Sequence, residues 1–155
     1  MEWSTVEFGK YSGKSLPQIM FTDADWFFNG YEKGYFRNDH ADEAAEIYRM
    51  SRAIRVPSRN GQKMAVEYIV HLSGEKGIIK FGTMQLIPYG PDSGCHNVSS
   101  TIDFYIPRSL MWNDKTGYKN FVFALKTILF GNRSHRMNRQ ACEAFFNDDD
   151  NFDLS

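Results

Sequence analysis

Glycine, lysine and serine are concentrated near the N-terminus in a pattern that could bind phosphate. Residues 9–15 have the sequence GKYSGKS, and glycine-rich loops of this kind can direct backbone N–H groups toward a phosphate group. A phosphate-binding loop requires four residues between its glycines and a continuous helix after them. Only three residues separate Gly9 from Gly13, and Pro17 interrupts the segment that follows. The sequence therefore does not predict nucleotide hydrolysis at this loop.

Basic residues are concentrated in two windows, although the 155-residue chain has a formal net charge of −1. Residues 48–63 contain five basic residues and no acid (+5), and residues 107–140 contain seven basic residues and one acid (+6). Residues 1–47 instead carry four basic and nine acidic residues (−5). Clustered cations release counterions from a phosphate backbone, whereas scattered cations do little. The distribution predicts a nucleic-acid-binding surface; the alternative is a solvated surface balanced by neighbouring acids.

The predicted nucleic-acid-binding residues belong to these two basic patches and to the N-terminal loop. Within each patch three arginines recur every three residues, roughly along one side of a helix, so each trio could follow a phosphate backbone. Tyr48, Trp112 and Tyr118 could stack on the bases of a single strand, unless they pack in the core. The binding set comprises Lys10, Lys14, Arg49, Arg52, Arg55, Arg59, Lys63, Arg133, Arg136 and Arg139.

The elements that must position these residues indicate an α+β domain over residues 1–147. Apolar periodicity and capping residues predict helices that begin at Ser15 and at Thr22 or Asp23, and further helices over 41–54, over 118–130 and after Asn138. Alternation predicts a β-hairpin from strands 64–72 and 77–87, and a third strand over 101–106. A small antiparallel sheet of three or four strands, with helices at both chain ends, is the expected architecture.

The chain ends in an acidic tail, residues 148–155. Asp148, Asp149 and Asp150 precede Phe152, and this combination is similar to the acidic tip by which bacterial single-stranded DNA-binding proteins recruit partners. The similarity predicts a partner-binding tail made of these four residues. Phe152 is not the terminal residue, unlike the aromatic residue of that tip. The alternative is a tail that only improves solubility.

No catalytic residue, metal or cofactor is expected. The two cysteines and four histidines lack the spacing of a zinc site, including the conceivable set of Cys95, His96, His135 and Cys142. No Gly-x-Ser-x-Gly motif is present. A small nuclease is one alternative, for which the strand-associated acids worth testing as Mg²⁺ ligands are Glu67, Asp103 and Asp114.

One segment resembles a known family. Phe8 to Gly13, Leu16 and the run from Asp23 to Phe27 resemble the small accessory domain at the C-terminal end of exonuclease X, over about residues 6–34. Asn29 stands where that family usually has a tryptophan. The acidic motifs of the exonuclease catalytic domain are absent, so the resemblance implies association with DNA without cleavage. The layout of the remaining chain is similar to a family of uncharacterised phage and conjugative-element proteins.

Together these observations predict a non-enzymatic accessory protein of a phage or mobile element that binds nucleic acid, with single-stranded DNA as the favoured ligand. An alternative is an inhibitor or adaptor that binds a host nucleic-acid enzyme or defence complex.

Apolar runs such as Phe121–Leu125 are far shorter than a membrane span, and the N-terminus lacks the features of a secretory signal. A cytoplasmic protein without membrane contact is therefore expected. The sequence leaves the oligomeric state open.

Overall fold

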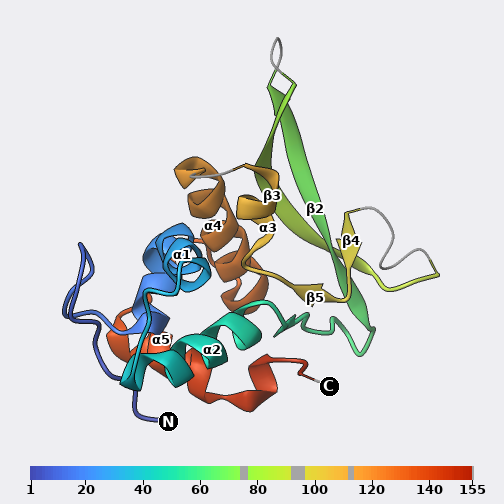
Figure 1. The fold of residues 1–155 in the computed structure, drawn as a ribbon. Helices are drawn as coiled ribbons and strands as arrows, with labels where there is room; N and C mark the ends of the chain where they lie inside the picture. The colour runs from blue at the N-terminus through green and yellow to red at the C-terminus, as the bar shows by residue number, and fades with distance from the viewer. Residues whose placement is uncertain (74–76, 92–96, 112–113, 155) are drawn as a thin grey trace.

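The computed structural model of the chain describes all residues except 74–76, 92–96, 112–113 and 155 (Figure 1). The helices are α1 (Leu16–Glu32), α2 (Asp39–Ser51), α3 (Ile106–Leu110), α4 (Lys115–Phe130) and α5 (Arg139–Asn147), followed by the 3₁₀ turn η2 (Asp149–Asn151). The strands are β1 (Ile54–Arg55), β2 (Met64–Ser73), β3 (Ile78–Pro88), β4 (Val98–Ser99) and β5 (Thr101–Ile102). The α+β prediction, with helices at both chain ends, is confirmed.

Two small antiparallel sheets replace the one sheet expected. One sheet has the order β3-β2-β4, and the other pairs β1 with β5. The predicted hairpin is present, and Gly82 is the extra residue of a β-bulge in β3. The predicted third strand over 101–106 ends early because the Asp103 carboxylate accepts the Tyr105 N–H at 2.8 Å and the chain turns into α3.

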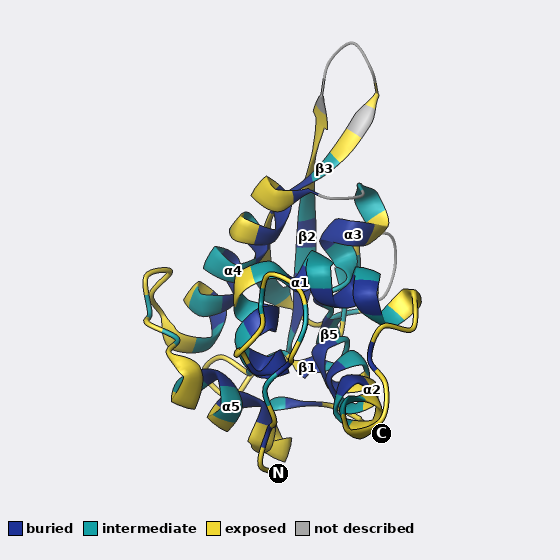
Figure 2. Cartoon of the chain, turned by 60° about the vertical axis from the view of Figure 1, so that its left-hand side comes forward, coloured by how far each residue is buried: buried dark blue, intermediate teal, exposed yellow. Residues whose placement is uncertain are grey.

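The core consists mainly of aromatic side chains that the helices supply. Helix α1 contacts α2, α4 and α5, and α4 packs against β3. Phe27 and Phe28 of α1, Phe121 of α4 and Phe146 of α5 are fully buried. Figure 2 shows the buried residues along the inner sides of these helices, whereas the described residues in the outer part of the β2–β3 hairpin are mostly exposed. The many phenylalanines of the sequence therefore fill one continuous core.

The N-terminal loop turns at two glycines with left-handed backbone conformations. Gly9 has φ +73° and Gly13 has φ +88°, and the Trp26 ring packs so close to Gly9 that a side chain there would collide with it. The two helices predicted after this loop are one helix, α1, with a kink at Asp23. The Asp23 carboxylate accepts the Trp26 N–H at 3.2 Å and so caps the second half of the helix.

Helix α4 begins at Lys115, three residues before the helix predicted over 118–130. Asp114 is the N-cap, and its buried carboxylate accepts the Gly117 N–H at 2.8 Å. A Cβ atom at Gly117 would overlap this carboxylate. The cap therefore requires glycine at this position.

We expect Gly117→Ala to lower the free energy of unfolding by about 1 kcal/mol. Alanine is the better helix former by about 1 kcal/mol, but loss of the cap costs up to about 2 kcal/mol. Urea denaturation measures the change. Thr116→Ala, at an exposed position of the same turn, is the control and should change the stability little. A Gly117→Ala variant as stable as the wild type would contradict the cap.

Candidate nucleic-acid interface

The arginine trio at the end of α2 is largely occupied by contacts within the protein. Arg49 forms an ion pair with Glu46 at 2.7 Å. Arg55 donates to the backbone carbonyl of Phe152 at 3.1 Å. Arg52 is held by a carboxylate from a distant part of the chain, as described next. The predicted use of this trio as a phosphate-binding row therefore requires at least two of its arginines to exchange a protein partner for a phosphate.

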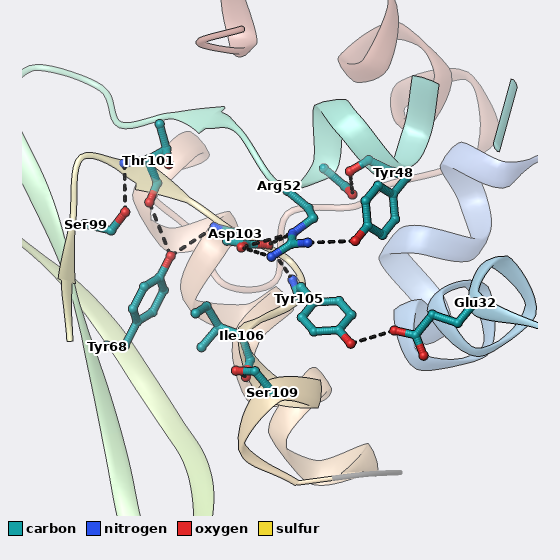
Figure 3. Close-up of polar contacts among 11 residues, drawn as sticks. Glu32, Tyr48, Arg52, Tyr68, Ser99, Thr101, Asp103, Tyr105, Ile106 and Ser109 are labelled. Carbon is teal, nitrogen blue, oxygen red and sulfur yellow. Dashed lines mark hydrogen bonds and ion pairs between the residues drawn. The ribbon is translucent and has the colours of Figure 1, made fainter. Parts of the chain in front are cut away.

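Arg52 joins α2 to the segment after β5 (Figure 3). Its Nε lies 3.3 Å from both carboxylate oxygens of Asp103, and its Nη1 donates to the Tyr48 hydroxyl at 2.7 Å. The guanidinium also lies over the Tyr105 ring, 4.7 Å from its centroid. Burial raises the pKa of Asp103, although the charge and hydrogen bonds of Arg52 act in the opposite direction. The Tyr68 hydroxyl accepts the Asp103 N–H at 2.9 Å, which completes a network that fixes this turn.

Lysines gather instead around a cleft between α1 and α4. The cleft has a volume of about 400 Å³, and its lining includes Lys10, Lys115, Lys119 and Lys126. The three lysines of α4 lie on one side of that helix, because their spacing of four and seven residues matches the helical period. Among the described residues, these three form no ion pair. Of the described residues that line the cleft, Asp23 is the one with a carboxylate.

Asp23 is already bound to two groups at the mouth of this cleft. Lys10 Nζ lies 3.3 Å from its carboxylate, and the Tyr11 hydroxyl donates to the same oxygen at 2.7 Å. Burial and this hydrogen bond raise the pKa of Tyr11, so its hydroxyl stays protonated and continues to donate. Asp23 is thus engaged within the protein, whereas the three lysines of α4 have no ion-pair partner among the described residues.

Two arginines extend the positive surface along the other side of α4. The Arg133 guanidinium lies 4.4 Å from the centroid of the half-buried Phe123 ring, which also lines the lysine cleft. Arg133 lines a hollow of about 270 Å³, and Arg59 lines a neighbouring one of about 310 Å³ that shares Thr83 and Thr127. Arg59 is fixed there because its Nη2 donates to the Ile128 carbonyl at 2.6 Å.

The fold therefore brings one residue of the window 48–63 and four residues of the window 107–140 to the same helix. We call the six cations around α4 the basic band: Lys10, Arg59, Lys115, Lys119, Lys126 and Arg133. Three of them, Lys10, Arg59 and Arg133, belong to the predicted binding set. The three α4 lysines were counted in the charge of window 107–140 but were not singled out. Their spacing on one side of an apolar helix was the signal available in the sequence.

The other predicted cations lie elsewhere or have partners of their own. Arg139 pairs with Glu143 at 2.6 Å, and Lys63 lies over the Tyr89 ring at 4.0 Å. Lys14 and Arg136 are exposed. None of these four lines the cleft or the two hollows of the basic band.

Two of the three aromatic residues predicted to stack on bases pack inside the protein. Tyr118 is buried. The half-buried Tyr48 ring stacks on Tyr31 with centroids 4.3 Å apart. Trp112 lies outside the described residues. Tyr11, Phe21 and Phe123 are partly exposed rings in the lining of the lysine cleft.

The predicted partner-binding tail is docked on the body. Phe152 is 2% exposed and packs on Phe145 and Phe146 of α5. Its side chain is therefore part of the core and is not free to bind a partner in this structure. Asp148 caps η2 by accepting the Asp150 N–H at 3.0 Å, while Asp149 and Asp150 are exposed. Only the acidic side chains of the predicted tail reach solvent.

The acids of the nuclease alternative do not converge. Asp103 is bound to Arg52, Asp114 caps α4, and Glu67 accepts from Gln85 at 2.8 Å. Within the described part of the chain, no three His, Cys, Asp or Glu residues are placed to hold a metal ion together. Burial raises the pKa of the Cys142 thiol to about 11. Cys95 and His96 of the conceivable zinc set lie outside the described residues.

Comparisons with protein-family models, with curated protein sequences and with solved structures found no match to this chain. None of the helices in the described residues has both the length and the apolar character needed to span a membrane. The functional argument therefore rests on the geometry and charge of the basic band.

Proposed function

We propose that the protein binds nucleic acid through the basic band as a non-enzymatic accessory protein, with single-stranded DNA as the favoured ligand. The observation that supports this most directly is the cleft between α1 and α4, where four lysines surround one carboxylate that Lys10 and Tyr11 already engage. Clustered cations can release counterions from a phosphate backbone, and the three lysines of α4 form no ion pair with the described residues. The resemblance of residues 6–34 to an accessory domain of a DNA exonuclease agrees with this role, and we propose that the protein belongs to a phage or mobile element.

The shape of the cleft favours one strand over a duplex. A volume of about 400 Å³ between two helices accommodates a few groups of a flexible backbone. Tyr11 and Phe123 provide partly exposed rings beside the lysines. Single-strand binders combine a positive groove with aromatic rings in this way, and such binding is tolerant of sequence.

The double variant Lys119→Ala/Lys126→Ala tests the proposal. We expect the slope of log K against log salt concentration to become shallower by about 1.4, since each phosphate contact to a single strand contributes about 0.7. Fluorescence anisotropy with a labelled single-stranded oligonucleotide, from about 50 to 200 mM salt, measures the slope.

The matched control removes two exposed cations outside the basic band, Lys33→Ala/Arg37→Ala, with the same change in net charge. Its slope should equal that of the wild type. Wild-type binding that is undetectable at low salt, or that does not depend on salt, would overturn the proposal. Equal losses in the two double variants would overturn the assignment to the basic band.

A further inference from the structure

Strands β2 and β3 extend beyond the body of the protein as a two-stranded arm (Figures 1 and 2). Register pairs Val70 with Phe81 and Leu72 with Ile79, on the same face as the buried Tyr68. The apolar face of the hairpin thus continues past the core. Val70 is 37% exposed, Leu72 74% and Ile79 39%. The arm carries three of the eight large apolar side chains exposed among the described residues.

Among the described residues, the β4 side of β2 has no strand paired with it along this arm. Strand β4 pairs with β2 only at Val66 and Glu67, and the Tyr68 N–H then donates to the Asn97 carbonyl at 2.8 Å. Backbone groups of alternate residues point to the same edge of a strand. The N–H and C=O groups of Val70 and Leu72 therefore point to the edge that Tyr68 uses. Among the described residues, no strand pairs with them there.

The two edges of the arm differ in their protection against strand pairing. The β3 edge has the Gly82 bulge and Lys80, and both features hinder the addition of another strand. The β2 edge from Ile69 to Leu72 has no bulged residue, no proline and no Lys, Arg, Asp or Glu. An apolar edge without such protection is suited to pairing with a second strand.

We propose that two copies of the chain associate by antiparallel pairing of this β2 edge. The same segment of a second copy is also extended and uncharged, and the backbone groups of its Val70 and Leu72 point to the same edge. One antiparallel pairing about a two-fold axis therefore satisfies these backbone groups in both copies. Only one register pairs both Val70 and Leu72 of each copy with described residues whose edge groups are available. In this register Val70 lies opposite Leu72 of the second copy. A register with Val70 opposite Val70 would pair Leu72 with Tyr68, but the backbone N–H and C=O groups of Tyr68 already bond to Asn97.

This register places His71 directly opposite His71 of the second copy, in a pair without backbone hydrogen bonds. Cα atoms in such pairs are about 4.5 Å apart. That distance lies within the range of about 4.4–6.8 Å that a disulfide spans. Because the proposed interface is a single strand edge, we expect it to bury less than about 1,200 Å² and to give a weak dimer, with a dissociation constant on the order of 10–1,000 μM.

Sedimentation equilibrium without nucleic acid, over that concentration range, tests the association. We expect Leu72→Lys to weaken the dimer about two- to thirtyfold, because two symmetric cross-strand pairs are lost. Ile79→Lys makes the same change on β3, away from the paired edge, and should leave the constant unchanged. In a Cys95→Ser background, His71→Cys should form an intermolecular disulfide under mild oxidation, and Ile79→Cys should not.

A protein that stays monomeric throughout this range would overturn the proposal. Equal cross-linking of the two cysteine variants would overturn the register. If the protein stays monomeric but binds an unrelated apolar peptide along β2, the partner of this edge is not a second copy, and the proposal is wrong. These outcomes are independent of the basic band, because neither Leu72 nor His71 lines its cleft or hollows.

Discussion

Arg108→Met is expected to lower the free energy of unfolding by about 3 kcal/mol. The Arg108 side chain is 1% exposed, and it holds Asp25 at 2.7 Å and Glu32 at 2.9 Å. Removing one partner of a buried ion pair costs about 3–5 kcal/mol, because the remaining charges lose their counter-charge. We expect the lower end of that range, since the Glu32 side chain reaches solvent and can be hydrated. Urea denaturation with an unchanged m-value measures the loss.

The pH dependence of the same variant provides a second test. Burial alone would raise the pKa of Glu32, but hydrogen bonds from Arg108 and Tyr105 hold it below its ordinary value. A lowered pKa in the folded state stabilises the protein above the unfolded value of about 4.3, and this contribution is lost as the pH falls through the folded value. In Arg108→Met, Glu32 loses most of this stabilisation. The free energy of unfolding should therefore change less as the pH falls from about 4.3 through the folded pKa of Glu32.

Arg136→Met serves as the control, because Arg136 is exposed and forms no ion pair with the described residues. Its stability should change by less than about 0.5 kcal/mol. If both variants lose the same stability, the loss does not come from the ion pairs of Arg108. An Arg108→Met variant with wild-type stability would show that the paired carboxylates are solvated well enough without it.

Arg108 also shows what the charge pattern of the sequence cannot predict, namely which basic residues are buried in ion pairs. In the sequence it is one of seven basic residues in the window 107–140 and resembles the others. Its burial depends on Asp25 and Glu32 of α1, more than 70 residues away. The pairing of Arg52 with Asp103 is likewise distant. Clustering along the chain shows where basic residues are dense in the sequence, but it could not show which of them have partners within the protein.

Local signals predicted the elements better than the site. The Asn138 cap and the helix after it are present, with the Asn138 side chain accepting the Ala141 N–H at 2.8 Å. The hairpin follows from alternation and is also present. The lysine cleft depends on how α1, kinked at Asp23, lies beside α4. That arrangement comes from packing between helices, which neither helix encodes in its own periodicity.

The C-terminal segment was predicted as a tail because its polar composition outweighs one aromatic residue. The structure instead docks it against the body through that residue. The Phe152 ring lies 5.4 Å from the Phe145 ring and 5.6 Å from the Phe146 ring, measured between centroids. Phe152 also forms a β-bridge with Ile54. A short polar segment can thus be fixed by one buried side chain, and composition alone does not detect this.

Phe152→Ala should therefore lower the free energy of unfolding by about 3–5 kcal/mol, the cost of removing a fully buried phenylalanine. A partner-binding tail predicts no such loss. The double variant Asp149→Asn/Asp150→Asn keeps the aromatic residue and should change stability by less than about 0.5 kcal/mol, since both side chains are exposed. Urea denaturation separates the two cases. If Phe152→Ala were as stable as the wild type, the segment would be a tail after all; a large loss shows that it completes the core through Phe145 and Phe146.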